Sequence, residues 1–174
     1  SLPLNDIIGS RLSLHFQGQI ICQACGRKTN KSFSQGHCYP CMNKLAACDM
    51  CIMKPEQCHF DKGTCREPEW GERNCMVHHI VYLANTSALK VGITRESQVP
   101  TRWMDQGATE ALPIFRVGTR YISGLVEVEI AKLTADKTNW RAMLKGDGEP
   151  IPLKDKVAEV APKISEILNQ VRND

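Results

Sequence analysis

Nine cysteines, all of them within residues 22–75, constrain the fold of this 174-residue chain more than any other feature. Cys22 and Cys25 form one C-x2-C pair, Cys38 and Cys41 form a second, and twelve residues separate the two pairs. A tight turn between two thiolates aims both sulfurs at one metal ion, and two such turns complete the tetrahedron of a structural zinc site. These two pairs therefore predict one zinc site.

The later cysteines predict a second tetrahedral zinc site. Its expected ligands are Cys48, Cys51, Cys58 and Cys65. Cys48 and Cys51 repeat the C-x2-C spacing, and His59 or Cys75 is an alternative ligand for the other half of the site. Four thiolates can also hold an iron–sulfur cluster, which the spacing leaves open. A disulfide framework is less expected, because the cysteine count is odd and the segment shows no secretory signal peptide.

Composition divides the chain into regions of different character. The segment around the cysteines contains few large apolar side chains, so we expect its folding to depend on zinc, whereas the sequence from about His79 onward has an ordinary apolar pattern. The expected regions are an N-terminal hairpin at 1–21, a two-zinc domain at 22–78, a second domain at 79–146 and a C-terminal helix at 153–174.

Charge and hydropathy narrow the functional classes. The net charge of +3 is too small to argue for nucleic-acid binding by itself. No apolar run reaches the roughly 18 residues of a transmembrane helix, and we expect a cytoplasmic, reducing location without membrane contact. The chain begins at Ser1 rather than at methionine, so a fragment of a longer protein is one interpretation, and upstream residues could then carry function.

The second half predicts an alternation of strands and helices. Residues 79–84 and 89–94 are β-rich runs around a polar turn and predict a hairpin. Pro100 stands at the start of a predicted helix, a position where its missing N–H is not needed. A third strand is expected at 113–121 and a helix at 122–133. Residues 66–72, by contrast, are expected to form a loop.

These elements carry short motifs in a recognisable order. Tyr82 is followed by Lys90-Val91-Gly92, then by Arg102-Trp103 on the next helix and Glu127 on a later one. This order resembles the GIY-YIG nuclease domain, with IVY at 80–82 and KVG at 90–92 in the places of its two motifs. The chain as a whole resembles an uncharacterised bacterial family that joins cysteine knuckles to such a domain. The resemblance rests on CQACGRKTNKSFSQGHCYPC, TCREPEWGE, VYLANTSALKVGITR and DKTNWRAML.

The resemblance implies an α+β fold in which the zinc-knuckle half packs on a small mixed sheet with flanking helices. It also implies a metal-dependent nuclease. Glu127 would hold Mg²⁺ or Mn²⁺, Arg102 would neutralise the phosphate, and Tyr82 would position or deprotonate the attacking water. A carboxylate suits Mg²⁺, and arginine's planar fork matches phosphate oxygens. Lys90 replaces the second-motif tyrosine and would contact phosphate or accept a proton.

Other residues provide alternatives. Gln106 stands where such nucleases often have histidine, Glu129 competes with Glu127 for the acidic role, and Asn139 is a candidate for orienting the site or capping a helix. The expected function is cleavage of DNA or RNA, with the knuckles stabilising the fold and helping to bind the phosphate backbone. Two alternatives are a zinc-containing protein that binds nucleic acid without cutting it and a zinc-supported protein-interaction module.

Overall fold

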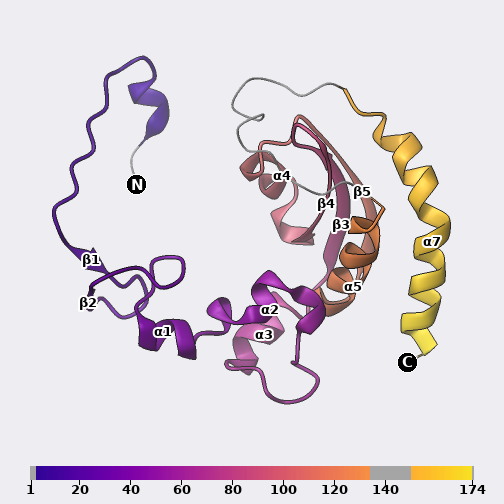
Figure 1. Ribbon diagram of the computed structural model, residues 1–174, viewed down its shortest axis with the longest axis horizontal. Coiled ribbons are helices and arrows are strands. Elements are labelled where there is room, and N and C mark those ends of the chain that lie inside the picture. Colours follow the sequence, from indigo (N-terminus) through magenta and orange to yellow (C-terminus); the bar gives the residue numbers. More distant parts are fainter. Residues whose placement is uncertain (1–2, 134–149, 174) are drawn as a thin grey trace. The chain divides into compact units, whose positions relative to one another are not determined.

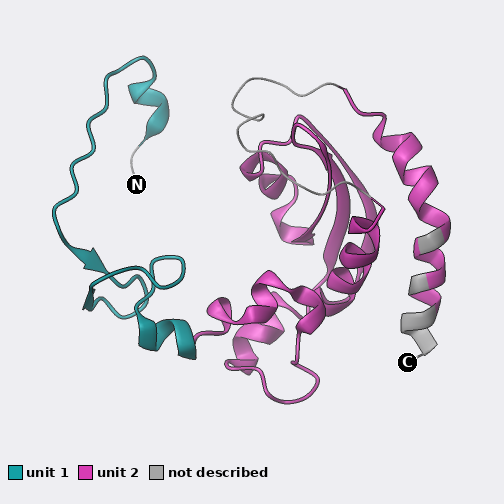
Figure 2. Ribbon diagram, viewed as in Figure 1, with its two compact units in different colours: residues 1–44 teal, residues 45–174 magenta. Residues whose placement is uncertain are grey.

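The computed structural model describes residues 3–133 and 150–173, and the chain divides into two compact units, residues 1–44 and residues 45–174 (Figure 2). The protein is a mixed α+β structure with two small antiparallel sheets. The boundary between the units falls between the two cysteine groups. The second group therefore belongs to the same unit as the larger sheet.

The first unit contains little regular structure. Its elements are η1 (Leu4–Ile7), β1 (Ile20–Ile21), β2 (Lys28–Thr29) and α1 (Tyr39–Lys44). β1 and β2 pair as a short antiparallel ribbon. The hairpin expected within residues 1–21 is wrong, because residues 11–17 form no strand. Leu12, Leu14 and Phe16 alternate with polar residues but are exposed, so the alternation has no apolar surface of this unit to cover.

The second unit begins with short helical pieces and continues into the larger sheet (Figure 1). Its elements are η2 (Ala46–Cys48), α2 (Met50–Met53), η3 (Pro55–Gln57), α3 (Pro68–Asn74), β3 (His79–Asn85), β4 (Leu89–Arg95), η4 (Glu96–Gln98), α4 (Thr101–Asp105), β5 (Glu110–Val117), α5 (Arg120–Ala131) and α7 (Leu153–Asn173). The hairpin predicted from residues 79–94 is confirmed as β3 and β4.

The larger sheet has the strand order β4-β3-β5 and is entirely antiparallel. The expectation of a mixed sheet is therefore wrong. β4 and β5 run in the same direction, since each is antiparallel to β3, but β3 lies between them and keeps them from pairing. The pairing of β3 with β5 shifts register between Val81 and Tyr82. Pro113 lies in β5, an edge strand of this sheet, where a residue without an N–H is tolerated.

Alternate residues of β3 face two different layers of the unit. Val81 and Leu83 pack into a core with α5 and α7, to which Val126 and Ile164 contribute. Tyr82 lies on the opposite face, with partly buried residues that include Trp103 of α4. All seven residues of β3 are buried. Both faces of the central strand are thus covered by helices.

The cysteine-rich part of this unit packs directly against the sheet's helices. Residues 66–72 were expected to form a loop, but α3 occupies most of them, and Pro68 stands in its first turn where proline is well tolerated. η3 lies against α5 at Gly124, where an added Cβ would come within 2.5 Å of the Glu56 backbone nitrogen. Only glycine permits this approach.

The C-terminal helix α7 runs continuously through Pro162. Val157, Val160 and Ile164 contribute to the core, as their helical spacing predicts. A proline inside a helical pattern predicts a kink or a restart of the helix, and at Pro162 the helix does not restart. None of the helices in residues 3–133 and 150–173 is both long enough and apolar enough to span a membrane.

Candidate metal centres and a polar cleft

The first cysteine group is built from two local turns. The Cys22 N–H donates to the Arg27 carbonyl and the Gly26 N–H donates to the Cys22 carbonyl, each at 2.9 Å. Gly26 has φ +71°, a left-handed conformation that favours glycine. In the second turn, the Met42 N–H donates to the Cys38 carbonyl at 2.9 Å. Backbone hydrogen bonds within each turn therefore fix the local conformation of both C-x2-C pairs.

The four sulfurs of this group converge on one point. The Sγ atoms of Cys22, Cys25, Cys38 and Cys41 all lie within 4.8 Å of one another, and Cys25 Sγ and Cys38 Sγ are 3.8 Å apart. Four sulfurs about 2.3 Å from a tetrahedral zinc ion lie about 3.8 Å from each other. A cluster would distribute its ligands over separate iron atoms, so this spacing favours a single ion. The cysteines predicted from sequence could hold one metal here.

Hydrogen bonds to the sulfurs prepare the group for a cation. The Cys38 N–H donates to Cys22 Sγ at 3.3 Å, and this bond is the main cause that lowers the pKa of Cys22 to about 5. Arg27 Nε donates to Cys25 Sγ at 3.2 Å. The pKa of Cys41 is instead raised to about 12, first by its hydrogen bond with Cys25. The thiolate form is therefore favoured at Cys22 and Cys25. A bound cation would be needed to keep all four cysteines deprotonated.

The second cysteine group is arranged differently from its prediction. A small cavity of about 10 Å³ in the second unit is lined by four cysteines: Cys51, Cys58, Cys65 and Cys75. Cys48 does not line it, although it belongs to the predicted ligand set. Burial is the main cause that raises the pKa of Cys51 to about 12 and of Cys75 to about 11, and Cys58 acts in the same direction on both.

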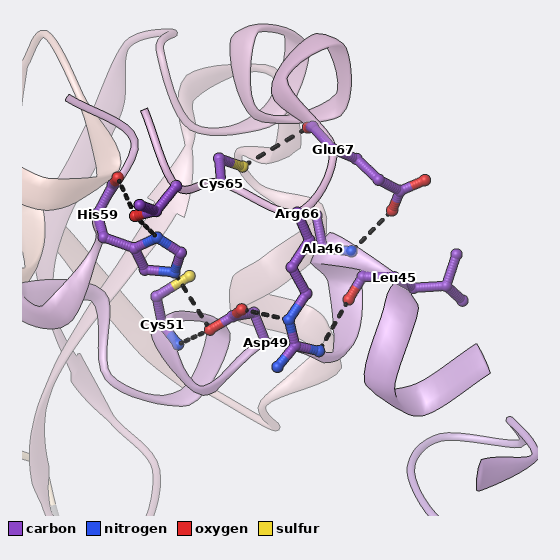
Figure 3. Close-up of polar contacts among 9 residues, drawn as sticks. Leu45, Ala46, Asp49, Cys51, His59, Cys65, Arg66 and Glu67 are labelled. Carbon is purple, nitrogen blue, oxygen red and sulfur yellow. Dashed lines mark hydrogen bonds and ion pairs between the residues drawn. The ribbon is translucent and has the colours of Figure 1, made fainter. Parts of the chain in front are cut away.

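A polar network adjoins these cysteines (Figure 3). Ligand atoms of Asp49, Cys51 and His59 lie within 4.8 Å of one another and form a second group that could hold metal. Asp49 Oδ1 accepts a hydrogen bond from the Cys51 N–H at 3.2 Å and so caps α2, while its Oδ2 lies 2.6 Å from Arg66 Nε. His59 Nδ1 is 2.8 Å from Thr64 Oγ1.

A larger, polar cleft of about 420 Å³ lies in the same unit, between the sheet and the cysteine-rich segment. It is lined by three of the four residues assigned to catalysis by the resemblance, namely Lys90 of β4, Arg102 of α4 and Glu127 of α5. Gln106 also lines it. The structure thus brings these side chains together from elements that are far apart in the sequence. Their role in catalysis is a prediction of the resemblance.

Tyr82, the fourth of these residues, lies behind the cleft wall. Its side chain is fully buried and its hydroxyl donates to Gln106 Oε1 at 2.5 Å. Burial raises the pKa of Tyr82 to about 12, although Arg102 acts in the opposite direction. A Cβ at Gly92, the residue opposite on β4, would come within 2.7 Å of the tyrosine ring. The glycine of the KVG motif therefore makes room for the tyrosine of the IVY motif.

Two further arginines, which are basic residues of the second half that no motif assigns to a site, line the cleft. Arg95 Nη1 donates to Asn74 Oδ1 at 2.5 Å, and Arg120 Nη2 donates to the Ile52 carbonyl at 2.8 Å. The Arg120 N–H donates to the Cys75 carbonyl, also at 2.8 Å. Both side chains are held by the cysteine-rich segment. No motif marks them, because their role depends on this packing.

The remaining candidates lie elsewhere. Glu129 is 2.5 Å from Lys132 Nζ and does not line the cleft, although it was the competitor of Glu127. Asn139 lies outside the described residues.

Comparison with known proteins gives one finding. The model of a family described as "Protein of unknown function (DUF2797)" matches residues 9–174. Neither the curated proteins nor the solved structures include a match to this chain.

Proposed function

The chain belongs to the DUF2797 family, and we propose that the cleft of its second unit binds a nucleic acid and cleaves its phosphodiester backbone with the help of a divalent cation. The family description states no activity, so the proposal is argued from the cleft. It agrees with the GIY-YIG resemblance, because the residues matched by position lie in or directly behind this cleft.

The charge of the cleft carries the proposal. Four cationic and two acidic side chains line it: Lys90, Arg95, Arg102, Arg120, Asp105 and Glu127. A concave surface with an excess of positive charge attracts polyanions and concentrates them near the site. A net charge of only +3 for the whole chain makes this local concentration of cations more informative. Phosphate oxygens are the natural partners of the arginine forks.

Glu127 suits a cation site by its chemistry. Its carboxylate belongs to the half-buried face of α5 and lines the cleft. Mg²⁺ and Mn²⁺ prefer such hard oxygen ligands, and Mg²⁺ commonly binds through one or two carboxylates together with substrate phosphate and water. When bound, the cation would supply Lewis-acid polarisation of the phosphoryl group and a water of lowered pKa. Glu127 would hold it on the side of the cleft formed by α5.

The other side chains have complementary roles. Arg102, exposed at the start of α4, would bind phosphate oxygens and stabilise the charge that develops on them. Lys90 would contact an adjacent phosphate. Tyr82 is buried and donates its hydroxyl proton to Gln106, and burial raises its pKa further above neutral pH, so its role is to hold Gln106 rather than to deprotonate water.

The test is cleavage of labelled single- and double-stranded DNA and RNA with Mg²⁺ or Mn²⁺. Glu127→Gln and Arg102→Ala are expected to lower the rate by at least about 100-fold each, as for other groups that stabilise transition-state charge. Glu129→Gln, on the same helix but outside the cleft, and Arg116→Ala, which pairs with Glu96, are the matched controls and should retain the parent rate. Equal loss in the controls would contradict the assignment.

The burial of Tyr82 favours one second candidate, a protein that binds nucleic acid without cutting it. In that case every nucleic acid would stay intact while binding falls steeply with salt, since arginine and lysine contacts to phosphate release counterions. Arg102→Ala would then weaken binding and flatten the salt dependence by about one phosphate contact. A parent chain that neither binds nor cuts would favour the protein-interaction module.

A further inference from the structure

The five cysteines outside the first group occupy two kinds of place in the second unit. Four of them line one small cavity: Cys51, Cys58, Cys65 and Cys75. The fifth, Cys48, ends η2 and does not line the cavity. We propose that Cys51, Cys58, Cys65 and Cys75 bind a second structural zinc ion, and that Cys48 is the one cysteine left outside both metal centres.

The four cysteines come from four successive pieces of the chain. Cys51 lies in α2, Cys58 follows η3, Cys65 precedes α3, and Cys75 caps the C-terminus of α3. These pieces are short: α2 and η3 are single helical turns, and only α3 reaches about two turns. A zinc ion with one ligand from each piece would hold all of them together, as closed four-cysteine sites do in small domains.

Gly71 in α3 shapes this site. A Cβ at Gly71 would come within 3.2 Å of Cys65 Sγ and within 2.8 Å of the Phe60 ring. The Cys75 N–H donates to the Gly71 carbonyl at 2.7 Å, so Gly71 lies one helical turn before Cys75. Because Gly71 has no side chain, the Cys65 sulfur can lie directly against α3 at this point. Cys75 follows one helical turn later. Cys75 itself is only 4% exposed.

The size of the cavity suits a single ion. Its volume of about 10 Å³ is close to that of one water-sized sphere. Among the described residues, no three of these four sulfurs lie within 4.8 Å of one another. Binding would therefore draw the thiolates inward by rotation of their side chains.

The neighbouring polar residues already have other partners. Asp49 caps α2 and pairs with Arg66, and His59 shares a hydrogen bond with Thr64 and lies 3.6 Å from Asp49. Ligation by Asp49 would compete with a 2.6 Å ion pair. Four soft thiolates around one cavity are the better donor set for zinc. We therefore assign Asp49 and His59 to the polar surroundings of the ion.

The test is alkylation of the folded, zinc-loaded full chain with iodoacetamide, followed by peptide mass mapping. Zinc-bound thiolates are protected, so Cys48 is expected to be the labelled cysteine, and metal analysis should give about two zinc ions per chain. This measurement needs no variant and does not depend on folding of a mutant. Labelling of Cys75 together with protection of Cys48 would overturn the proposal.

Three variants sharpen the result. Cys75→Ser should lower the zinc content from about two ions to about one and expose Cys51, Cys58 and Cys65 to alkylation while the first group stays protected. Cys48→Ser, the matched control, should retain both ions and lose the label. His59→Gln should also retain both ions. Loss of one zinc ion in Cys48→Ser or in His59→Gln would contradict the ligand set. The readout is independent of any cleavage activity.

Discussion

The first cysteine group lies in a unit whose only buried residues, within the described range 3–44, are Cys22 and Cys38. The second group lies in a unit with a continuous apolar core that includes Leu83 of β3, Val126 of α5 and Ile164 of α7. In the first unit the candidate metal-binding cysteines are the core. In the second unit the cysteines are an addition to the core, because the sheet and its helices bury apolar surface without them. The cysteines of the two groups thus have different structural roles, as the core of the first unit and as an addition to the core of the second.

Metal removal should separate the two units most clearly. After chelation, amide hydrogens of residues 20–41 are expected to lose their protection from exchange, since structural zinc contributes about 10–16 kcal/mol to the folding of comparable peptides. Amides of β3 should stay protected, because apolar burial stabilises that strand. Hydrogen exchange with peptide-level mass analysis measures both regions in one sample.

Cys22→Ser serves as the control, since it should reproduce the exchange in residues 20–41 without chelation. Continued protection of residues 20–41 in the metal-free chain would show that the first unit has another source of stability. Loss of protection in β3 would instead show that the sheet also depends on metal.

The same contrast explains how much the sequence could predict. The ligands of the first group follow from spacing, because hydrogen bonds within each C-x2-C turn fix their geometry. In the second group, spacing and cavity lining point to different cysteines. Cys48 and Cys51 share the C-x2-C spacing, yet only Cys51 lines the cavity, since a capped turn of α2 at Asp49 separates the two cysteines. The spacing of cysteines in the sequence therefore predicts a metal site only where the cysteines belong to one local turn.

The cleft shows the same limit. The order of motifs predicted that Lys90, Arg102 and Glu127 would lie together, and the structure places them in one cleft. The sequence shows Arg95 and Arg120 as basic residues but does not assign them to the cleft, because their position depends on contacts with Asn74 and with the Ile52 carbonyl. The antiparallel pairing of β5 with β3 could not be predicted either, since strand order is set by long-range packing rather than by the pattern of any one strand.

Acid should test the second unit through a group that is not a cysteine. His79 of β3 is fully buried, and its Nδ1 lies 2.7 Å from the Val77 carbonyl. Burial is the main cause that lowers the pKa of His79 to about 4. The unfolded chain, with an ordinary histidine pKa of about 6.5, then binds a proton more readily than the folded chain. Stability is therefore complete above pH 6.5 and falls as the pH drops toward 4.

The size of this effect is about 3 kcal/mol, from a pKa difference of about two and a half units. Urea unfolding of the zinc-loaded chain between pH 7 and pH 4 measures it. His79→Asn keeps a donor for the Val77 carbonyl but does not titrate, so its unfolding free energy should depend less on pH in this window. Equal slopes for the parent and the variant would show that His79 is not the group responsible.

Two glycines should give the smallest effects and distinguish local from tertiary constraints. Gly124→Ala adds a Cβ within 2.5 Å of the Glu56 nitrogen, and such overpacking costs about 1–3 kcal/mol, which outweighs the helix propensity that alanine gains. Gly26→Ala meets no atom within 4 Å but has φ +71°, so it costs about 1–2 kcal/mol of backbone strain.

The measured quantities differ because the two units depend on different sources of stability. Gly124→Ala should lower the urea midpoint of the second unit and leave the zinc affinity of the first group unchanged. Gly26→Ala should weaken that zinc affinity by about 5- to 30-fold without moving the urea midpoint, since folding of the first unit is coupled to metal binding. Gly118→Ala, with no atom within 4 Å and no positive φ, is the control for both. If Gly26→Ala shifted the urea midpoint instead, the first unit would have to share the core of the second.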